Sequence, residues 1–350
     1  MSAPIRIAII GVQHYHANFW TKAVLAREDA AIAGIWDSNS DFAKQFADGY
    51  GLQAFADQAA LLNACDAVAI CSTTNDHKAL IAAAVAARKP ILCEKPLAVS
   101  LDEGVEICKM VRDAALPFMQ SFPKRFDPVT HAVKELVVSG DLGTIAMCRI
   151  RHGHSHGLSE DFRKAWFVDP AKSGGGTLLD EGVHAADFLR FVFGEPESVF
   201  ARLSSRTLGL PVEDTAAATY SYSSGMLAEV ATSWCFAAAD HSIEIYGTGG
   251  TVLVSGVDIA SRPTREKAFL QVFRREGPNR GWEASDIVPN FKTGVFHEHV
   301  AWAFVDALSK DAAMPTGPID GLYASAMIEA AYTSAKTQSA AAIVYPEVQP

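Results

Sequence analysis

The chain has 350 residues, of which 49% are hydrophobic and 20% charged, and its formal net charge is -10. This length exceeds what one hydrophobic core usually serves, so we expect two domains. The composition is typical of a globular protein rather than a disordered one. The negative charge argues against nucleic acid as a partner, because that affinity comes largely from clustered Lys and Arg.

The sequence contains no signal for secretion or membrane insertion. Residues 1–6 lack a basic region followed by an apolar one. The uninterrupted apolar stretch 79–87 is far shorter than the roughly 18 residues that a membrane helix needs. The six cysteines include no C-x-x-C pair. We therefore expect a cytoplasmic protein without a membrane anchor.

The first third of the chain alternates between strand-like and helix-like segments. The strand-like runs are short, stop at polar residues or a turn, and cover 5–10, 31–36, 67–71, 90–93 and 116–120. The segments with helical composition cover 16–27, 40–50, 77–88 and 101–114. This alternation predicts a parallel sheet with crossover helices, of the α/β class.

From about residue 122 the pattern changes to consecutive strands. Extended runs cover 145–156, 198–206, 215–223, 226–236, 241–246 and 251–254, with Ser-Gly or Gly-Gly turns between some of them. Helical segments cover 128–139, a stretch beginning near Asp180, 296–310 and 321–336. We predict an N-terminal domain at 1–123 and a C-terminal α+β domain at 124–350, built on a large, mostly antiparallel sheet.

The turn after the first strand is a candidate phosphate-binding loop. A pyrophosphate needs backbone N–H groups at a helix N-terminus, and glycine allows its close approach. Residues 11–16, Gly-Val-Gln-His-Tyr-His, keep only the first glycine of G-x-G-x-x-G. Asp37 follows the second strand about 20 residues later, where a carboxylate can bind a ribose hydroxyl and disfavour a 2′-phosphate. The pattern favours NAD over NADP, and a capping aspartate in an ordinary turn is the alternative.

Lys95 lies in the run Glu-Lys-Pro-Leu at 94–97, directly after the apolar segment 90–93. It should therefore lie at the carboxyl end of a strand, where open α/β sheets bind ligands. Pro96 biases the preceding backbone toward an extended conformation, and Glu94 can orient or charge-balance the lysine. A surface lysine in a loop is the alternative.

Asp180 and His184 lie in the run Gly-Gly-Gly-Thr-Leu-Leu-Asp-Glu-Gly-Val-His at 174–184. Their spacing of four places both side chains on one face of a helix. A lysine, a carboxylate and a histidine suffice to move a proton and to hold an alkoxide.

Three histidines, at positions 152, 154 and 156, share one face if their segment is a strand. They suit contacts to substrate or polar partners, plain exposure, or a metal site. Gly153 and Gly157 indicate a bending loop, which favours the first interpretation, and we expect no metal ligands. His14 and His16 are likewise expected to be structural rather than metal ligands.

Together these runs resemble the Gfo/Idh/MocA family of nicotinamide-dependent sugar and polyol oxidoreductases, over nearly the whole chain. The resemblance implies a Rossmann domain followed by a substrate domain. It implies catalytic roles for Lys95, Asp180 and His184. The implied cofactor contacts are Gly11, Gln13, His14, Tyr15, Asp37, Ser72, Thr73, Thr74, Asn75, His77, Glu94, Lys95 and Arg125. The implied substrate contacts are His152, His154, His156, Arg163 and Trp166.

Some of these positions depart from the family pattern or allow another interpretation. Two glycines of the phosphate loop are missing, and Thr74 stands where the family usually has proline. Asn75 or Asp76 also suits a helix cap, and Arg125 equally suits a surface salt bridge.

The resemblance implies hydride transfer between NAD and a secondary alcohol or ketone of a sugar, inositol or related polyol. His184 would act as general base and acid, Asp180 would orient it or bind a neighbouring hydroxyl, and Lys95 would stabilise oxyanion charge. Two alternatives are a redox-neutral glycosidase that oxidises its substrate transiently and a non-catalytic ligand sensor on the same scaffold. Family analogy also implies a homodimer or homotetramer.

Overall fold

The computed structural model describes residues 3–237, 240–258, 264, 268–287 and 294–348. It divides into two compact units. The first contains residues 1–123, 294–322 and 346–350, and the second contains 124–293 and 323–345. Residues 294–322, which the sequence pattern assigned to the C-terminal domain, therefore group with the first unit. Among the described residues no helix is both long enough and apolar enough to cross a bilayer.

The first unit is built on a five-stranded parallel sheet in the order β2-β1-β3-β4-β5. Its strands are β1 (Ile5–Ile10), β2 (Ala30–Trp36), β3 (Ala67–Ile70), β4 (Ile91–Cys93) and β5 (Phe118–Gln120). From β1 the chain passes to β2 on one side and then to β3 on the other. This reversal creates a switch point between β1 and β3, the place where open α/β sheets bind ligands.

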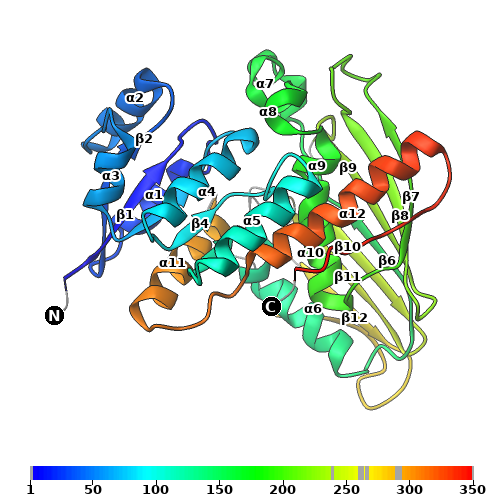
Figure 1. Cartoon of the computed structure of the whole chain (residues 1–350). Coiled ribbons are helices and arrows are strands. Elements are labelled where there is room, and N and C mark those ends of the chain that lie inside the picture. Colours follow the sequence, from blue (N-terminus) through cyan, green and yellow to red (C-terminus); the bar gives the residue numbers. More distant parts are fainter. Residues whose placement is uncertain (1–2, 238–239, 259–263, 265–267, 288–293, 349–350) are drawn as a thin grey trace. The chain divides into compact units, whose positions relative to one another are not determined.

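Helices pack against this sheet, and all of them except the late α11 lie between its strands along the chain (Figure 1). They are α1 (Ala17–Leu25), α2 (Ser40–Tyr50), α3 (Gln58–Ala64), the 3-10 turn η1 (Thr74–Asp76), α4 (His77–Ala86), α5 (Leu101–Asp113) and α11 (Val295–Ser309). Every residue of β3 is buried, as expected of a parallel strand covered on both faces. The late helix α11 is fastened to α1, because Trp302 Nε1 donates to the Ala23 carbonyl at 3.0 Å.

The second unit contains a nine-stranded sheet in the order β13-β12-β11-β10-β6-β9-β8-β7-β14. All neighbouring strands pair antiparallel except β6 and β9. The strands are β6 (Ile145–Arg151), β7 (Ser198–Ser204), β8 (Thr215–Ser221), β9 (Leu227–Ser233), β10 (His241–Gly247), β11 (Gly250–Val257), β12 (Leu270–Arg274), β13 (Gly281–Ala284) and β14 (Ala341–Ala342). The predicted large, mostly antiparallel sheet is confirmed.

Helices cover one face of this sheet (Figure 1). The longer ones are α6 (Pro128–Val138), α10 (Gly182–Phe193) and α12 (Pro318–Thr337), whose Ser334 hydroxyl accepts from the Ala201 backbone N–H on β7 at 3.0 Å. The short turns are η2 (Pro123–Phe126), η3 (His156–Leu158), α7 (Glu160–Lys164), η4 (Trp166–Val168), α8 (Pro170–Ser173) and α9 (Thr177–Asp180). On the opposite face, side chains of the five neighbouring strands β10, β6, β9, β8 and β7 point outward.

Candidate active site

The turn that follows β1 requires glycine at its first position. Gly11 has φ +79, and a Cβ built there would lie 2.5 Å from the Cβ of Ser72 at the end of β3. The Val12 N–H donates to Asp37 Oδ2 at 2.8 Å, and Asp37 is only 4% exposed. Asp37 therefore lies beside the turn at the end of β2, where a ribose-binding carboxylate is expected.

Histidines fill the part of the loop where two glycines are missing. His16 stands at the third glycine position, and its Nδ1 lies 3.3 Å from Glu94 Oε2. His14 is buried, and its Nδ1 accepts the backbone N–H of His16 at 3.2 Å. Burial and then the neighbouring His16 hold the pKa of His14 well below its ordinary value, against the opposing effect of Glu94. Tyr15, by contrast, is 45% exposed.

At the end of β3, Ser72, Thr73 and Thr74 are buried, whereas Asn75 is exposed. Asn75 Nδ2 donates to Asp76 Oδ1 at 3.0 Å. Asp76 precedes α4 but makes no side-chain cap hydrogen bond there, so the capping alternative is not observed.

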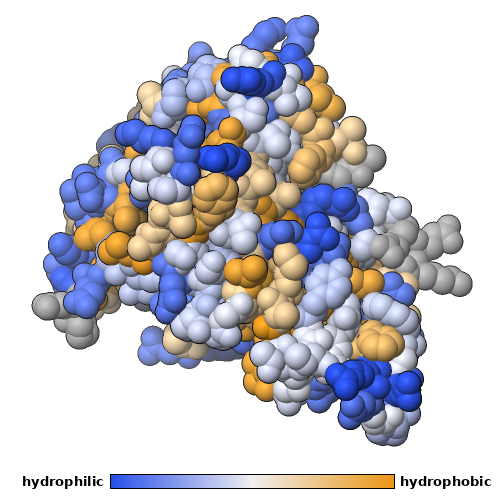
Figure 2. Space-filling model, turned by 90° about the vertical axis from the view of Figure 1, so that its right-hand side faces the viewer, coloured by the Kyte–Doolittle hydropathy of each residue, from blue (hydrophilic) through white to orange (hydrophobic). Residues whose placement is uncertain are grey.

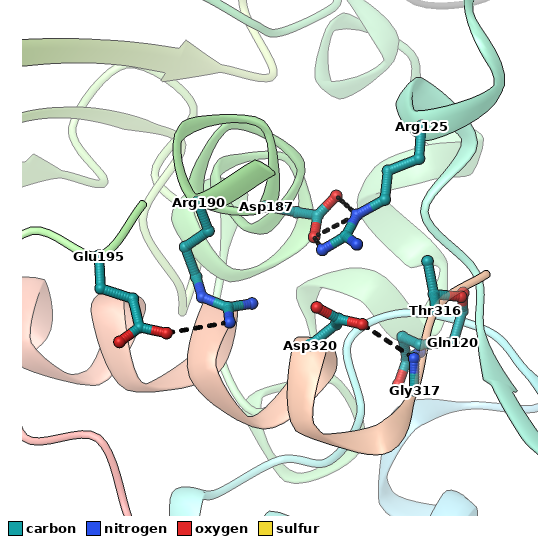
Figure 3. A network of polar contacts seen from close by, with 8 residues as sticks. All are labelled: Gln120, Arg125, Asp187, Arg190, Glu195, Thr316, Gly317 and Asp320. Atoms are coloured by element: carbon teal, nitrogen blue, oxygen red, sulfur yellow. Dashed lines mark hydrogen bonds and ion pairs between the residues drawn. The ribbon is translucent and has the colours of Figure 1, made fainter. Parts of the chain in front are cut away.

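His77 and Gln120 hold the turn that carries Lys95. The ring Nδ1 of His77 lies 3.0 Å from the Pro96 carbonyl, and Gln120 Nε2 donates to the Glu94 carbonyl at 3.0 Å. Thr316 fixes Gln120 in turn, because its hydroxyl donates to the Gln120 backbone carbonyl at 2.6 Å; both residues appear in Figure 3. Lys95 is 3% exposed and directly follows Glu94 after β4, so its predicted place at the carboxyl end of a strand is confirmed.

Asp180 and His184 do not lie on one continuous helix, which corrects the sequence-based expectation. Asp180 is the last residue of α9, and His184 is the third residue of α10. Glu181 separates the two helices, and its carbonyl accepts the backbone N–H of His184 at 3.2 Å. Asp180 Oδ2 accepts a hydrogen bond from Trp234 Nε1 at 3.0 Å. Trp234 directly follows β9, so the end of this strand orients the Asp180 carboxylate.

Arg125 forms a partly buried ion pair with Asp187 on α10 (Figure 3). Its Nε lies 3.0 Å from Oδ2, and a terminal nitrogen lies 2.6 Å from Oδ1, so the pair is bidentate. Asp187 is 1% exposed. Of the two interpretations given by the sequence, the structure therefore contains the salt bridge, although in a partly buried position.

Beyond the end of β6 at Arg151, the backbone continues to pair with β9 as far as His154. The backbone N–H groups of His152 and His154 donate to the carbonyls of Ala231 and Ser233 on β9. Gly153 lies between them, and a Cβ there would come within 2.5 Å of the Ser233 carbonyl oxygen. The expected shared face therefore holds for His152 and His154, which are buried, but His156 begins the turn η3 and is exposed.

Glu181 joins these histidines into a polar cluster with His241. Its two carboxylate oxygens face His152 Nε2 at 2.9 Å and His154 Nε2 at 3.4 Å, and His152 Nδ1 lies 2.7 Å from His241 Nδ1. Burial alone would raise the pKa of Glu181, but hydrogen bonds from the two histidines outweigh it and hold the pKa well below its ordinary value. Burial, and then the nearby Lys124 and His152, keep the pKa of His241 well below the ordinary value for histidine.

Two predicted substrate residues make contacts within their own loop. Arg163 Nε donates to the Gly157 carbonyl at 2.7 Å, which closes the turn around η3. Trp166 stacks on Phe167 with ring centroids 4.0 Å apart and packs against a small hydrophobic cluster around Trp234. Their role toward a substrate stays a prediction.

Sequence reasoning missed Glu181, His241 and Lys124 as members of this region. Glu181 lies in the run 174–184, between the predicted catalytic residues Asp180 and His184, and this position could have indicated its role. His241 reaches His152 only because β10 pairs with β6. Lys124 is buried, which lowers its pKa, and Asp127 partly opposes that effect.

Comparison with known proteins identifies the family. Residues 5–122 match the model described as an oxidoreductase family with an NAD-binding Rossmann fold, and residues 130–253 match the GFO/IDH/MocA C-terminal domain. The chain belongs to the Gfo/Idh/MocA oxidoreductase family. Residues 5–122, within the first unit, are accordingly the NAD-binding Rossmann domain.

Two curated relatives and one solved structure illustrate the range of this Gfo/Idh/MocA chain's neighbours. Inositol 2-dehydrogenase from Rhizobium meliloti (strain 1021) is 29% identical over 94% of this chain and 96% of its own. D-apiose dehydrogenase from Rhizobium rhizogenes is 28% identical over 87% of this chain and 88% of its own. An oxidoreductase from Agrobacterium radiobacter, crystallised with NAD+, L-tartaric acid and magnesium, has a TM-score of 0.83 at 25% identity, covering 97% and 99%.

Proposed function

We infer that this Gfo/Idh/MocA oxidoreductase transfers a hydride between NAD(H) and a secondary alcohol or ketone of a sugar, inositol or related polyol. The observation that carries the proposal is the buried Lys95 at the carboxyl end of β4, in the same unit as the glycine turn at the β1/β3 switch point. The relatives named for inositol and apiose dehydrogenation support the substrate class.

The first unit offers residues that suit NAD. Gly11 leaves room for a close approach at the turn, Asp37 lies beside it, and Ser72 and Thr73 follow the neighbouring strand β3. Bound NAD accepts a hydride from the alcohol or returns one to the ketone. The carboxylate of Asp37 disfavours a 2′-phosphate at this place, so we expect NAD to bind more tightly than NADP.

In the second unit, His184 would take the hydroxyl proton as the hydride leaves. Histidine suits this task because its ordinary pKa lies near neutrality. Asp180 would bind a neighbouring hydroxyl or orient the base, while Lys95 would stabilise the negative charge that develops on the substrate oxygen. The imidazole and carboxylate groups around Glu181 supply donors and acceptors of the kind that a polyol requires.

A screen of sugars and polyols, followed by NADH absorbance, tests this proposal. With a substrate in hand, Lys95→Ala or His184→Ala should lower turnover by on the order of 10² or more and leave NAD affinity nearly unchanged. Asp37→Ala should weaken NAD binding and leave turnover at saturating NAD nearly unchanged. Near-normal turnover in His184→Ala would contradict its role as the base.

The same screen separates the alternatives. Product formation without net NADH would support a redox-neutral glycosidase, and ligand binding without turnover would support a sensor. We also propose that the chain is cytoplasmic, since all six cysteines are free thiols, and that it forms a homodimer or homotetramer.

A further inference from the structure

We propose that His152, Glu181 and His184 form a binding site for a divalent transition-metal ion, with Zn²⁺ as its best occupant, and that an ion bound there inhibits the enzyme. The three side chains come from the end of β6, the junction between α9 and α10, and α10 itself. One potential ligand atom of each lies within 4.8 Å of those of the other two. All three residues are buried, with exposed fractions of 3%, 6% and 8%.

The hydrogen bonds around His152 suit a metal ligand. Its Nδ1 lies 2.7 Å from His241 Nδ1, so His241 can accept a hydrogen bond from the His152 Nδ1–H. The other nitrogen, Nε2, faces the Glu181 carboxylate at 2.9 Å, and two electron-rich atoms this close require a cation between them. In the metal-free protein a proton lies between His152 Nε2 and the Glu181 carboxylate, and a bound metal ion would replace that proton. A ligating histidine usually has an acceptor on its second nitrogen, as His241 provides here.

Two other groups of side chains in the described residues are less suitable. One contains His154, Asp180 and Glu181, and the other contains His14, His16 and Glu94. The Nδ1 atoms of His154 and His14 each accept a backbone N–H, from His156 at 3.1 Å and from His16 at 3.2 Å. Their ring protons must then lie on Nε2, which makes that nitrogen a hydrogen-bond donor rather than a ligand. His154 accordingly supports Glu181 from outside the proposed site.

The donor set points to a transition metal. Two imidazoles and one carboxylate suit Zn²⁺ and its neighbours, whereas Mg²⁺ and Ca²⁺ prefer oxygen ligands. The anionic Glu181 lies next to Asp180 along the chain, so a divalent ion meets favourable charge. Three protein ligands leave a coordination position open, as in other sites that are accessible to small molecules.

The consequence for activity rests on the function proposed above. A metal ion bound to His184 occupies the nitrogen lone pair with which the residue would accept the substrate proton. Metal binding and base catalysis are therefore mutually exclusive at this residue. In the proposed mechanism His184 supplies the base and Lys95 the positive charge, so a chelator should leave activity intact or raise it.

Binding is tested first, without any substrate. The full chain, carrying no polyhistidine tag and stripped of metal, is titrated with Co²⁺ while visible absorption is recorded, and Zn²⁺ is then added. We expect uptake of one equivalent of Co²⁺ and its displacement by Zn²⁺. His152→Asn and Glu181→Gln should each weaken binding by about 100-fold or more, because loss of an outer partner alone costs about 10–100-fold. His241→Asn removes only such an outer partner, so it should weaken Co²⁺ binding by about 10–100-fold.

The matched controls are His131→Asn and Glu135→Gln, two exposed side chains of the same unit, which should bind Co²⁺ like the wild type. Circular dichroism and NAD affinity show whether each variant is folded. X-ray absorption of the zinc-loaded wild type needs no variant, and it should reveal two imidazole ligands and an oxygen ligand. Sulfur ligands, the absence of stoichiometric uptake, or unchanged affinity in both His152→Asn and Glu181→Gln would overturn the site.

Activity is tested second, with a substrate from the screen. Stoichiometric Zn²⁺ should reduce wild-type turnover at least tenfold, and a chelator should restore it. Turnover that increases with Zn²⁺ would overturn the inhibitory role. Failure of the substrate screen would weaken the proposed function but would leave the Co²⁺ and X-ray results, and thus the metal site, unaffected.

Discussion

Glu181 connects the two histidines that follow β6, and its charge gives the second unit a pH-dependent stability. Because its pKa is depressed in the folded state, its contribution is present above the unfolded value of about 4.3 and is lost as the pH falls through the folded value. Glu181→Gln should lower the free energy of unfolding at pH 7 by about 1.5–3 kcal/mol, the range for hydrogen bonds to charged groups.

Urea unfolding of the wild type and Glu181→Gln at several pH values checks this prediction. The difference between the two proteins should shrink as the solution is acidified. Exposed Glu135 provides the control, since Glu135→Gln should change little at any pH. A constant difference from pH 7 to acid would mean that the carboxylate stabilises the fold by packing rather than by charge.

Gly11 offers a second test at the scale of one residue, because Gly51 is a matched position. Both have positive φ, +79 and +66, but a Cβ at Gly11 would collide with Ser72, whereas one at Gly51 would meet nothing within 4 Å. Gly51→Ala should therefore cost only the left-handed strain, about 1–2 kcal/mol. Gly11→Ala should cost more and should also weaken NAD binding. Thermal unfolding and an NAD titration measure both effects, and equal behaviour of the two variants would contradict the close contact.

Among the elements, the sequence predicts those with a strong local pattern. The runs at 5–10 and 40–50 coincide with β1 and α2 as observed. Strands β12 and β13 were not predicted, because Leu270–Arg274 and Gly281–Ala284 are short and lie toward one edge of the sheet. Helix α3 was also missed, since its seven residues are too few for a clear helical period.

In the candidate site, too, residues with a local sequence pattern were predicted and those placed by distant contacts were not. Lys95 was located because a strand followed by a turn is a local signal. The break between α9 and α10 was missed because its contacts come from residues distant in the sequence: Trp234 Nε1 donates to Asp180, and His152 Nε2 faces Glu181. The start of α9 is anchored in the same way. Glu213 accepts the backbone N–H groups of Gly176 and Leu178, and Tyr332 donates to the same carboxylate. His241, 89 residues away from His152, likewise has no local signal.

Helix α9 therefore depends on Glu213, which gives a prediction at the scale of the element. Glu213→Gln replaces one acceptor oxygen by a donor, so a backbone N–H of the first turn loses its partner. We expect a loss of about 1–3 kcal/mol in the free energy of unfolding, the cost of an unsatisfied buried group. Tyr332→Phe removes one hydrogen bond and keeps both backbone contacts, so its effect should be smaller. Denaturant unfolding compares them, and a larger effect of Tyr332→Phe would refute the anchoring role.

At the scale of the whole molecule, we expect the self-association proposed above to use the face of the nine-stranded sheet that is opposite its helices. Side chains of β6 to β10 that point outward include Phe200, which is 41% exposed, and Ala217. Arg149 lies among them and pairs with Glu229 at 2.9 Å and Glu244 at 3.2 Å. Figure 2 views the side on which Figure 1 draws this sheet, and hydrophobic residues there are interspersed with hydrophilic ones. A non-obligate interface is about as apolar as the rest of a protein surface, so this mixed composition suits one.

If two copies associate through this face, a charged side chain introduced on it should separate them. Ala217 is exposed on β8, so Ala217→Arg adds a long cation without disturbing the buried face of the strand. Light scattering after size exclusion should give a multiple of 37.5 kDa for the wild type and a smaller mass for the variant. Lys164→Ala, on the exposed helix α7 away from the sheet, should keep the wild-type mass. Because an isologous contact repeats the substitution on both partners, one change introduces two buried cations and should be sufficient. A wild type that is monomeric at micromolar concentration, or an assembly that Ala217→Arg leaves intact, would assign this face another role.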